Sequence, residues 1–151
     1  MNRNYSDLLR EFNAAGVEYL IVGAHAVAFH AEPRFTKDLD LWIRPTPENA
    51  RRVHEALLRF GAPLGGVRVE DFSTQGLIYQ MGVEPVRIDV LTSVNGVDFD
   101  AAYAGRSRAR YLEIELPILS LDDLIASKKA AGRPQDLIDL EVLEQKRRGK
   151  S

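Results

Sequence analysis

Hydrophobic side chains recur in this sequence at two spacings, one helical and one extended. The helical spacing places Leu8, Leu9 and Phe12 on one face, and Gly16 follows at the position of a helix stop. The extended pattern is found in VEYLIVG (17–23), a short apolar run rich in β-forming residues that ends on glycine. We therefore expect a helix followed by a buried strand at the start of the chain.

The two patterns alternate through the rest of the chain. Helices are expected over residues 6–15, 24–31, 47–60, 98–105, 121–131 and 134–147. Strands are expected over 17–23, 39–43, 77–81, 86–91 and 110–119, with 77–81 and 86–91 forming a hairpin. The glycine-rich stretch 62–75 predicts no regular element. This order predicts an α/β fold in which helices flank a short mixed sheet, in one domain spanning residues 1–151.

Capping residues mark the starts of two of these helices. Thr46 offers a capping hydroxyl directly before Pro47. Ser120, with Asp123 three residues later, resembles a capping box. In the last helix the candidate core residues are Leu137, Leu140, Val142 and Leu143.

Composition and charge narrow the class of protein. Of the 151 residues, 45% are hydrophobic and 28% are charged, as in ordinary globular domains. No apolar run or leader-like start predicts contact with a membrane, so we expect a cytoplasmic protein. The absence of cysteine excludes disulfides and thiolate metal sites. A net charge of −2 gives no overall basic field, and the cations within 106–110 and 146–150 are either solvated or make a local phosphate or polynucleotide contact.

Three carboxylates point to metal chemistry. Asp38 and Asp40 are two residues apart in a predicted strand, so both project from one face. Two neighbouring carboxylates are costly to ionise together unless a hard cation such as Mg²⁺ neutralises them. Asp89 interrupts the apolar run VRIDVL, and if its strand lies beside the first, the three acids can form a two-metal phosphoryl-transfer site. Alternatively, these acids only solvate a sheet edge.

Residues around the acidic pair complete this hypothesis. Gly23 closes a strand and opens a helix, which places backbone N–H groups where a triphosphate could lie. His25 and His30 are five residues apart and do not share a helix face, so we interpret them as packing or supporting residues rather than zinc ligands. Trp42 follows Asp40 at a spacing of two and is a candidate for the wall of the cleft.

Three separated blocks of the chain together resemble the polymerase-beta-like nucleotidyltransferase superfamily. The signature of a strand, a glycine, a helix and then Arg-x-Thr-x-Asp-apolar-Asp is matched by VGA from Val22 and RFTKDLD from Arg34, with Asp89 later. The segment SKKAAGRPQDLIDLEVL from Ser127 resembles the C-terminal helical motif of the same superfamily. Within it, the chain is most similar to minimal, AbiEii-like abortive-infection members, which occur in toxin–antitoxin systems.

The resemblance implies a role for each matched residue. The implied catalytic and metal-binding residues, for Mg²⁺ or Mn²⁺, are Asp38, Asp40 and Asp89. The implied nucleotide-binding residues are Gly23, Ala24, Arg34, Thr36, Lys128 and Arg133, with Arg133 and Asp136 also anchoring the C-terminal helix of Lys128 to the site. Ala24 stands where the superfamily usually has glycine or serine, so the N–H donor is kept and a hydroxyl is absent. Lys128 is preferred to Lys129 as the triphosphate cation, and the alternative is that both belong to a solvated face.

The function implied is metal-dependent transfer of a nucleoside monophosphate from an NTP to an acceptor hydroxyl. The acceptor could be a protein side chain, the end of an RNA or a small molecule, and a toxin or antitoxin partner chain or a homodimer could supply the surface that binds it. One alternative is a catalytically degenerate, nucleotide-binding antitoxin. A second is a structural interaction module without ligand.

Overall fold

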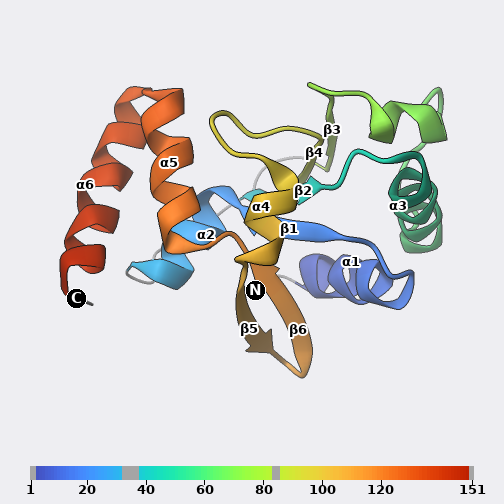
Figure 1. The fold of residues 1–151 in the computed structure, drawn as a ribbon. Helices are drawn as coiled ribbons and strands as arrows, with labels where there is room; N and C mark the ends of the chain where they lie inside the picture. Colours follow the sequence, from blue (N-terminus) through green and yellow to red (C-terminus); the bar gives the residue numbers. More distant parts are fainter. Residues whose placement is uncertain (1–2, 32–37, 83–85, 150–151) are drawn as a thin grey trace.

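The computed structural model describes residues 3–31, 38–82 and 86–149 (Figure 1). In this part of the chain a six-stranded mixed sheet has the strand order β3-β4-β2-β1-β6-β5. Its strands are β1 (Tyr19–Val22), β2 (Asp38–Ile43), β3 (Ile78–Met81), β4 (Arg87–Leu91), β5 (Ser107–Tyr111) and β6 (Ile114–Ile118). The helices are α1 (Arg3–Ala14), α2 (Gly23–His30), α3 (Pro47–Phe60), the 3₁₀ helix η1 (Val69–Ser73), α4 (Phe99–Ala104), α5 (Leu121–Ala131) and α6 (Pro134–Gly149). The predicted α/β class is confirmed.

Strand β2 lies in the interior of the sheet and separates an apolar face from a polar one. It pairs antiparallel with β1 and parallel with β4. Leu39, Leu41 and Ile43 are fully buried on one face. That face is covered by α1 and α3, which Figure 1 shows together on one side of the molecule, while α5 and α6 pack as a pair on the other. The opposite face of β2 carries Asp38 and Asp40. These acids therefore face the side of the sheet on which α5 and α6 lie.

The boundaries of α3 and α5 follow from their capping residues. The hydroxyl of Thr46 accepts a hydrogen bond from the N–H of Asn49 at 3.3 Å, and Gly61 ends α3 with φ of 93°. Ser120 accepts from the N–H of Asp123 at 3.2 Å. These contacts satisfy N–H groups that the first turn of a helix leaves without intrahelical partners, and the predicted starts of both helices are confirmed.

Residues 110–119 do not form the single strand predicted from their alternation. They contain a turn at Leu112 and Glu113, on either side of which Tyr111 pairs with Ile114. The two turn residues have φ of 48° and 66°. Hairpin turns with two positive φ angles normally carry asparagine or glycine, so the sequence offers no turn signal here. The stretch 62–75, for which no element was predicted, contains η1.

The buried side of α6 differs from the prediction at two positions. Leu143 is fully buried, but Leu137 and Val142 are 54% and 36% exposed. Asp136 and Asp139 are instead buried, each at 2% exposure. A helix that buries carboxylates in place of leucines cannot be oriented from its apolar periodicity alone.

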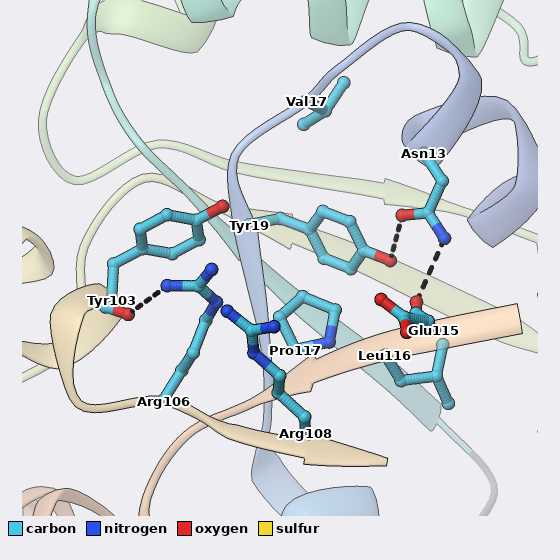
Figure 2. Close-up of a pocket in the computed structure, with 9 residues that line it drawn as sticks. All are labelled: Asn13, Val17, Tyr19, Tyr103, Arg106, Arg108, Glu115, Leu116 and Pro117. Carbon is cyan, nitrogen blue, oxygen red and sulfur yellow. Dashed lines mark hydrogen bonds between the residues drawn. The ribbon is translucent and has the colours of Figure 1, made fainter. Parts of the chain in front are cut away.

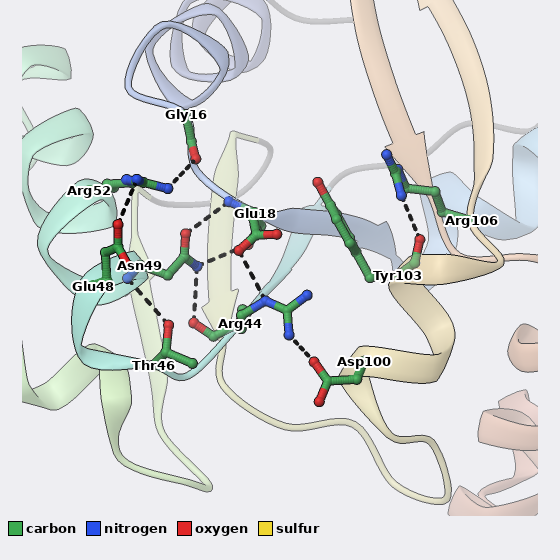
Figure 3. Close-up of polar contacts among 10 residues, drawn as sticks. All are labelled: Gly16, Glu18, Arg44, Thr46, Glu48, Asn49, Arg52, Asp100, Tyr103 and Arg106. Carbon is green, nitrogen blue, oxygen red and sulfur yellow. Dashed lines mark hydrogen bonds and ion pairs between the residues drawn. The ribbon is translucent and has the colours of Figure 1, made fainter.

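A buried asparagine ties α3 to the two strands beside it (Figure 3). Asn49 is 1% exposed, and its Oδ1 accepts from the N–H of Glu18 at 2.8 Å. Its Nδ2 donates to the carbonyls of Glu18 at 3.0 Å and Arg44 at 2.9 Å. One side chain thus satisfies three backbone groups at the start of β1 and the end of β2.

Replacement of Asn49 by alanine is expected to destabilise the protein by about 2–4 kcal/mol, because each buried backbone group left without a partner costs about 1–3 kcal/mol. The measurement is the midpoint of a urea unfolding transition. Glu48→Ala is the matched control, because Glu48 is a neighbouring exposed residue that pairs with Arg52 on the helix surface, and its loss should cost less than about 0.5 kcal/mol. Equal effects of the two substitutions would contradict this role of Asn49.

Candidate active site

The parallel pairing of β2 and β4 brings two of the predicted acids into contact. Asp40 lies directly opposite Asp89 in the register of the two strands. Asp89 is 8% exposed, and the two carboxyl groups are within hydrogen-bonding contact. Burial, together with the charges of Asp89 and Asp38, raises the pKa of Asp40 to about 7, and Arg87 opposes this effect. The site therefore disfavours the charged form of Asp40 in the absence of a further cation.

Arg87 lies between the carboxylates of Asp38 and Asp89. Its Nη2 is 2.9 Å from Asp38 Oδ2, and its Nε is 3.2 Å from Asp89 Oδ1. Sequence reasoning gave Arg87 no role, although its spacing of two from Asp89 places it on the same face of β4. The cation between Asp38 and Asp89 in this arrangement is the guanidinium group.

Gly23 is held against the carboxylate of Asp40. It has φ of 68°, and a Cβ atom at this position would lie 3.0 Å from Asp40 Cγ and 3.3 Å from Asp40 Cβ. Both the backbone angle and the lack of space require glycine. Ala24 follows in the first turn of α2, but it is not among the residues that line the cleft.

A cleft of about 490 Å³ opens in front of Asp40 and Asp89. Its walls come from the Gly23 turn, the ends of β3 and β4, the loop that follows β4, and the α5–α6 pair. Gly96 keeps that loop against α5, because a Cβ there would lie 2.6 Å from Ala130 Cβ. The cleft is therefore bounded on one side by the acids and on the other by the C-terminal helices.

Lys128 reaches this cleft from α5 as a half-buried cation. Its Nζ is 3.2 Å from both Asp136 and Asp139, and its side chain is 12% exposed. Arg133 Nε lies 2.7 Å from Asp136, with a side chain that is 76% exposed. Lys129, in contrast, is 57% exposed and pairs with Glu144. Lys128 therefore lines the cleft, whereas Lys129 lies on the exposed surface of α5.

Asp139 was missed by sequence reasoning. It lies one turn after Asp136 on a helix that is rich in charged residues, so nothing in the pattern distinguished it from a solvated acid. Only its position facing Lys128 makes it part of the site.

The pKa of Asp136 predicts how acid affects stability. The hydrogen bond from Arg133 lowers this pKa, against the effect of burial, and Lys128 lowers it further. A carboxyl whose folded pKa is depressed stabilises the fold above its unfolded pKa of about 3.9, and this contribution is lost as the pH falls through the folded value. Asp136→Asn should therefore destabilise the protein by about 2 kcal/mol near pH 7.

The difference between wild type and Asp136→Asn should narrow as the pH falls below about 4. The measurement is a series of unfolding midpoints from neutral to acid pH. Asp122→Asn is the control, because Asp122 is a largely exposed residue that pairs with Arg147 on the surface. A difference that stays constant down to the lowest pH would contradict the role given to Asp136.

The remaining predicted residues have varied positions. Arg34 and Thr36 lie outside the described residues. His30 is buried and its Nε2 is 2.7 Å from the carbonyl of Leu119, which confirms its packing role. His25 packs edge-on against Tyr5 at 5.7 Å, and burial lowers the pKa of His25 while Asp38 opposes that effect.

The prediction that Trp42 forms part of the wall of the carboxylate cleft is wrong. It is 2% exposed and packs edge-on against Phe99 at 5.0 Å. It lines a neighbouring hollow of about 350 Å³ instead.

The donor set of the site suits a hard cation. Across residues 3–31, 38–82 and 86–149, no group of three or more His, Asp and Glu side chains is arranged so that it could hold a metal ion. The Oδ1 atom of Asp38 is buried and accepts no hydrogen bond within the same ranges. Mg²⁺ is commonly bound by one or two carboxylates together with substrate phosphates. Asp40 and Asp89 fit that mode of binding, whereas Asp38 pairs with Arg87.

The arrangement of strands and helices is that of a nucleotidyltransferase fold, and the solved structures that share it include the following two. One is the lincosamide antibiotic adenylyltransferase LnuA with lincomycin bound, with a TM-score of 0.58, 13% identity, and coverage of 95% of this chain and 96% of that chain. The other is TM1012 of Thermotoga maritima, assigned as a nucleotidyltransferase, with a TM-score of 0.60, 15% identity, and coverage of 93% of each chain.

The chain belongs to the family described as "Nucleotidyl transferase of unknown function (DUF2204)", which matches residues 1–150. It is therefore a nucleotidyltransferase by family and by fold. No curated protein matches it. Within the described ranges, none of the helices has the length and apolar character needed to cross a membrane.

Proposed function

We propose that this protein transfers a nucleoside monophosphate from an NTP to an acceptor hydroxyl and releases pyrophosphate. The observation that carries this proposal is the contact between Asp40 and Asp89 at the floor of a cleft whose opposite wall holds Lys128. Asp38, Asp40 and Asp89 are the proposed catalytic carboxylates and ligands for Mg²⁺ or Mn²⁺. When bound, the metal would offset negative charge on the phosphates and lower the pKa of the attacking hydroxyl.

The chain's own residues divide the chemistry between the two walls of the cleft. The acceptor oxygen attacks the α-phosphorus, and the bond from that phosphorus to the bridging oxygen of pyrophosphate breaks. Asp89 takes up the proton of the acceptor hydroxyl. Lys128 neutralises charge on the pyrophosphate as it leaves, and the exposed side chain of Arg133 lies on the same wall of the cleft.

We also propose the subfamily and the biological context that the sequence resemblance implies. The chain is a single nucleotidyltransferase domain of the AbiEii-like kind, which acts in the cytoplasm as part of a toxin–antitoxin pair. A partner chain or a homodimer supplies additional surface for the acceptor. The resemblance of the sequence blocks around Val22, Arg34 and Ser127 supports this assignment.

A second candidate function is nucleotide binding without transfer. It is favoured by the ion pairs of Arg87 with Asp38 and Asp89, which place a protein cation where a metal-binding site would need open carboxylates. It is also favoured by Ala24, which lacks the hydroxyl of serine.

Labelled transfer and thermal stability together test the proposal. The protein is incubated with each α-labelled NTP, magnesium and a cell lysate, and its melting temperature is measured with and without magnesium and NTP. We expect label on an acceptor and a rise in melting temperature that is absent in Asp38→Ala with Asp40→Ala. A shift without labelling would support the second candidate, and a shift that survives in the double variant would refute the site.

A further inference from the structure

Three arginines line up along the edge strand of the sheet. Arg106, Arg108 and Arg110 occupy alternate positions in and just before β5, which is the last strand in the sheet order. Alternate positions of a strand project from one face, so the three form a stripe, which we call the β5 arginine stripe. Arg108 and Arg110 are exposed, and Arg106 is half-buried.

A cavity of about 330 Å³ adjoins this stripe (Figure 2). It lies where β1 and β6 diverge, since their parallel pairing is limited to Ile21 and Ile118. Arg106 and Arg108 line it together with Asn13, Tyr19 and Tyr103, and with the carboxylate-bearing residue Glu115. The hydroxyl of Tyr19 donates to Asn13 Oδ1 at 2.9 Å, so the polar wall is fixed in place.

The stripe arginines differ from a neighbouring arginine in having no carboxylate partner within the described part of the protein. Arg44 nearby is neutralised by ion pairs with Glu18 and Asp100 (Figure 3). Arg106 instead lies over the ring of Tyr103 at 4.1 Å and donates to the Tyr103 carbonyl at 2.7 Å. Among residues 3–31, 38–82 and 86–149, none of the three stripe arginines has a carboxylate ion-pair partner. A held guanidinium without a counter-ion is suited to an external anion.

The sheet register places the stripe on the same face as the acids. Ser107 pairs with Ile118, which in turn pairs with Ile21. The next residue of β1, Val22, pairs with Asp40. Because side chains alternate, the residue after Ser107 shares the face of Asp40, so the stripe begins level with the acids and then leads away from them.

The separation between the stripe and the acids suits a chain of phosphates. Strands β5 and β2 are three positions apart in the sheet, or roughly 14 Å, and Arg108 and Arg110 lie farther along the strand direction, at roughly 15–20 Å from Asp40. A stacked strand of nucleic acid rises about 3.4 Å per nucleotide, so four to six nucleotides cover this distance. A small molecule that reaches the acids would not reach Arg110.

We propose that the β5 arginine stripe and its cavity bind the backbone of a single-stranded polynucleotide whose 3′ hydroxyl is the acceptor. This inference rests on the proposed function. The 3′ oxygen forms a bond with the α-phosphorus of the NTP, the α–β phosphoanhydride bond breaks, pyrophosphate leaves, and the hydroxyl proton passes to Asp89. The strand is longer by one nucleotide. Guanidinium groups can pair with phosphates and stack on unpaired bases, which suits a single strand.

Fluorescence anisotropy with labelled RNA and DNA strands of about twelve nucleotides tests the binding. Arg108→Gln with Arg110→Gln removes two exposed charges without disturbing packed side chains. We expect this variant to bind roughly tenfold more weakly and to reduce the salt slope by about 2, measured between about 50 and 200 mM salt. Arg51→Gln with Arg59→Gln is the matched control, because it removes two exposed arginines of α3, on the other side of the sheet.

Extension of the strand tests the acceptor role. In the presence of magnesium and NTP the wild type should lengthen the strand by one nucleotide, while a 3′-deoxy strand should bind equally and stay unextended. The rise in melting temperature with magnesium and NTP should be unchanged in the β5 variant, so a failure of nucleotide binding is distinguishable from a failure of the stripe. The inference is overturned if the wild type binds neither strand, if the β5 variant binds as tightly as the control variant, or if label is transferred only to a protein or a small molecule.

Discussion

Replacement of Asp89 by asparagine is expected to lower the single-turnover rate of nucleotidyl transfer by about 10²–10⁴-fold while NTP binding largely survives. Asparagine keeps the volume of the side chain and can donate a hydrogen bond to Asp40, so the packing of β4 against β2 is retained. The lost charge removes the proposed proton acceptor. The measurements are single-turnover rates and NTP titrations, and an effect on binding as large as the effect on rate would contradict this division of roles.

Lys128→Met provides the contrast to Asp89→Asn. The long side chain keeps its stem but loses its charge, so the apparent NTP affinity should fall by about 1–3 kcal/mol. This variant also leaves Asp136 and Asp139 without their shared cation, so its melting temperature has to be measured in parallel. Lys129→Met is the control, because Lys129 is exposed at the surface of α5. Equal and small effects of Asp89→Asn and Lys128→Met would mean that the C-terminal helices do not serve the site.

Replacement of Gly23 by alanine is expected to reduce transfer by about 10²-fold, because a displacement of about 1 Å in a catalytic group has effects of this size. The added Cβ would meet the carboxylate of Asp40 and force it away from Asp89. The positive φ of Gly23 adds a backbone strain of about 1–2 kcal/mol. Activity and unfolding free energy are both measured.

Gly16→Ala separates these two effects. Gly16 has φ of 72°, close to that of Gly23, but a Cβ there would have no atom within 4 Å. The control should therefore lose a similar amount of stability and retain its activity. If both alanine variants retain activity, the contact between Gly23 and Asp40 does not position the carboxylate.

The sequence could predict those elements that have local causes. The start of α3 was predictable because Thr46 and Pro47 supply its cap, and the shared face of Asp38 and Asp40 follows from strand alternation alone. The pairing of Asp40 with Asp89 could be predicted only if β2 and β4 were assumed to be neighbours. The order of strands in a sheet depends on tertiary contacts that no local sequence pattern contains.

The features that were not predictable depend on tertiary contacts. The turn at Leu112 and Glu113 forms without a turn-favouring residue, because the pairing of β5 with β6 on either side of it holds the strained angles. The importance of Arg87 and Asp139 arises from their partners on other segments, namely Asp38 and Lys128. In each case the residue is visible in the sequence, but its contact with a residue from another segment is not.

The parallel pairing of β2 with β4 also determines when the acids come together during folding. Asp40 and Asp89 meet only after the chain closes a loop of 49 residues, a non-local step with a substantial loop-closure entropy. During synthesis, the segment that ends at Leu91 already contains all three acids, whereas Lys128 emerges later. Arg87 is synthesised with the acids and pairs with two of them. The countercharge of Asp38 and Asp89 therefore lies in the same segment of the chain as the acids and does not depend on the C-terminal helices.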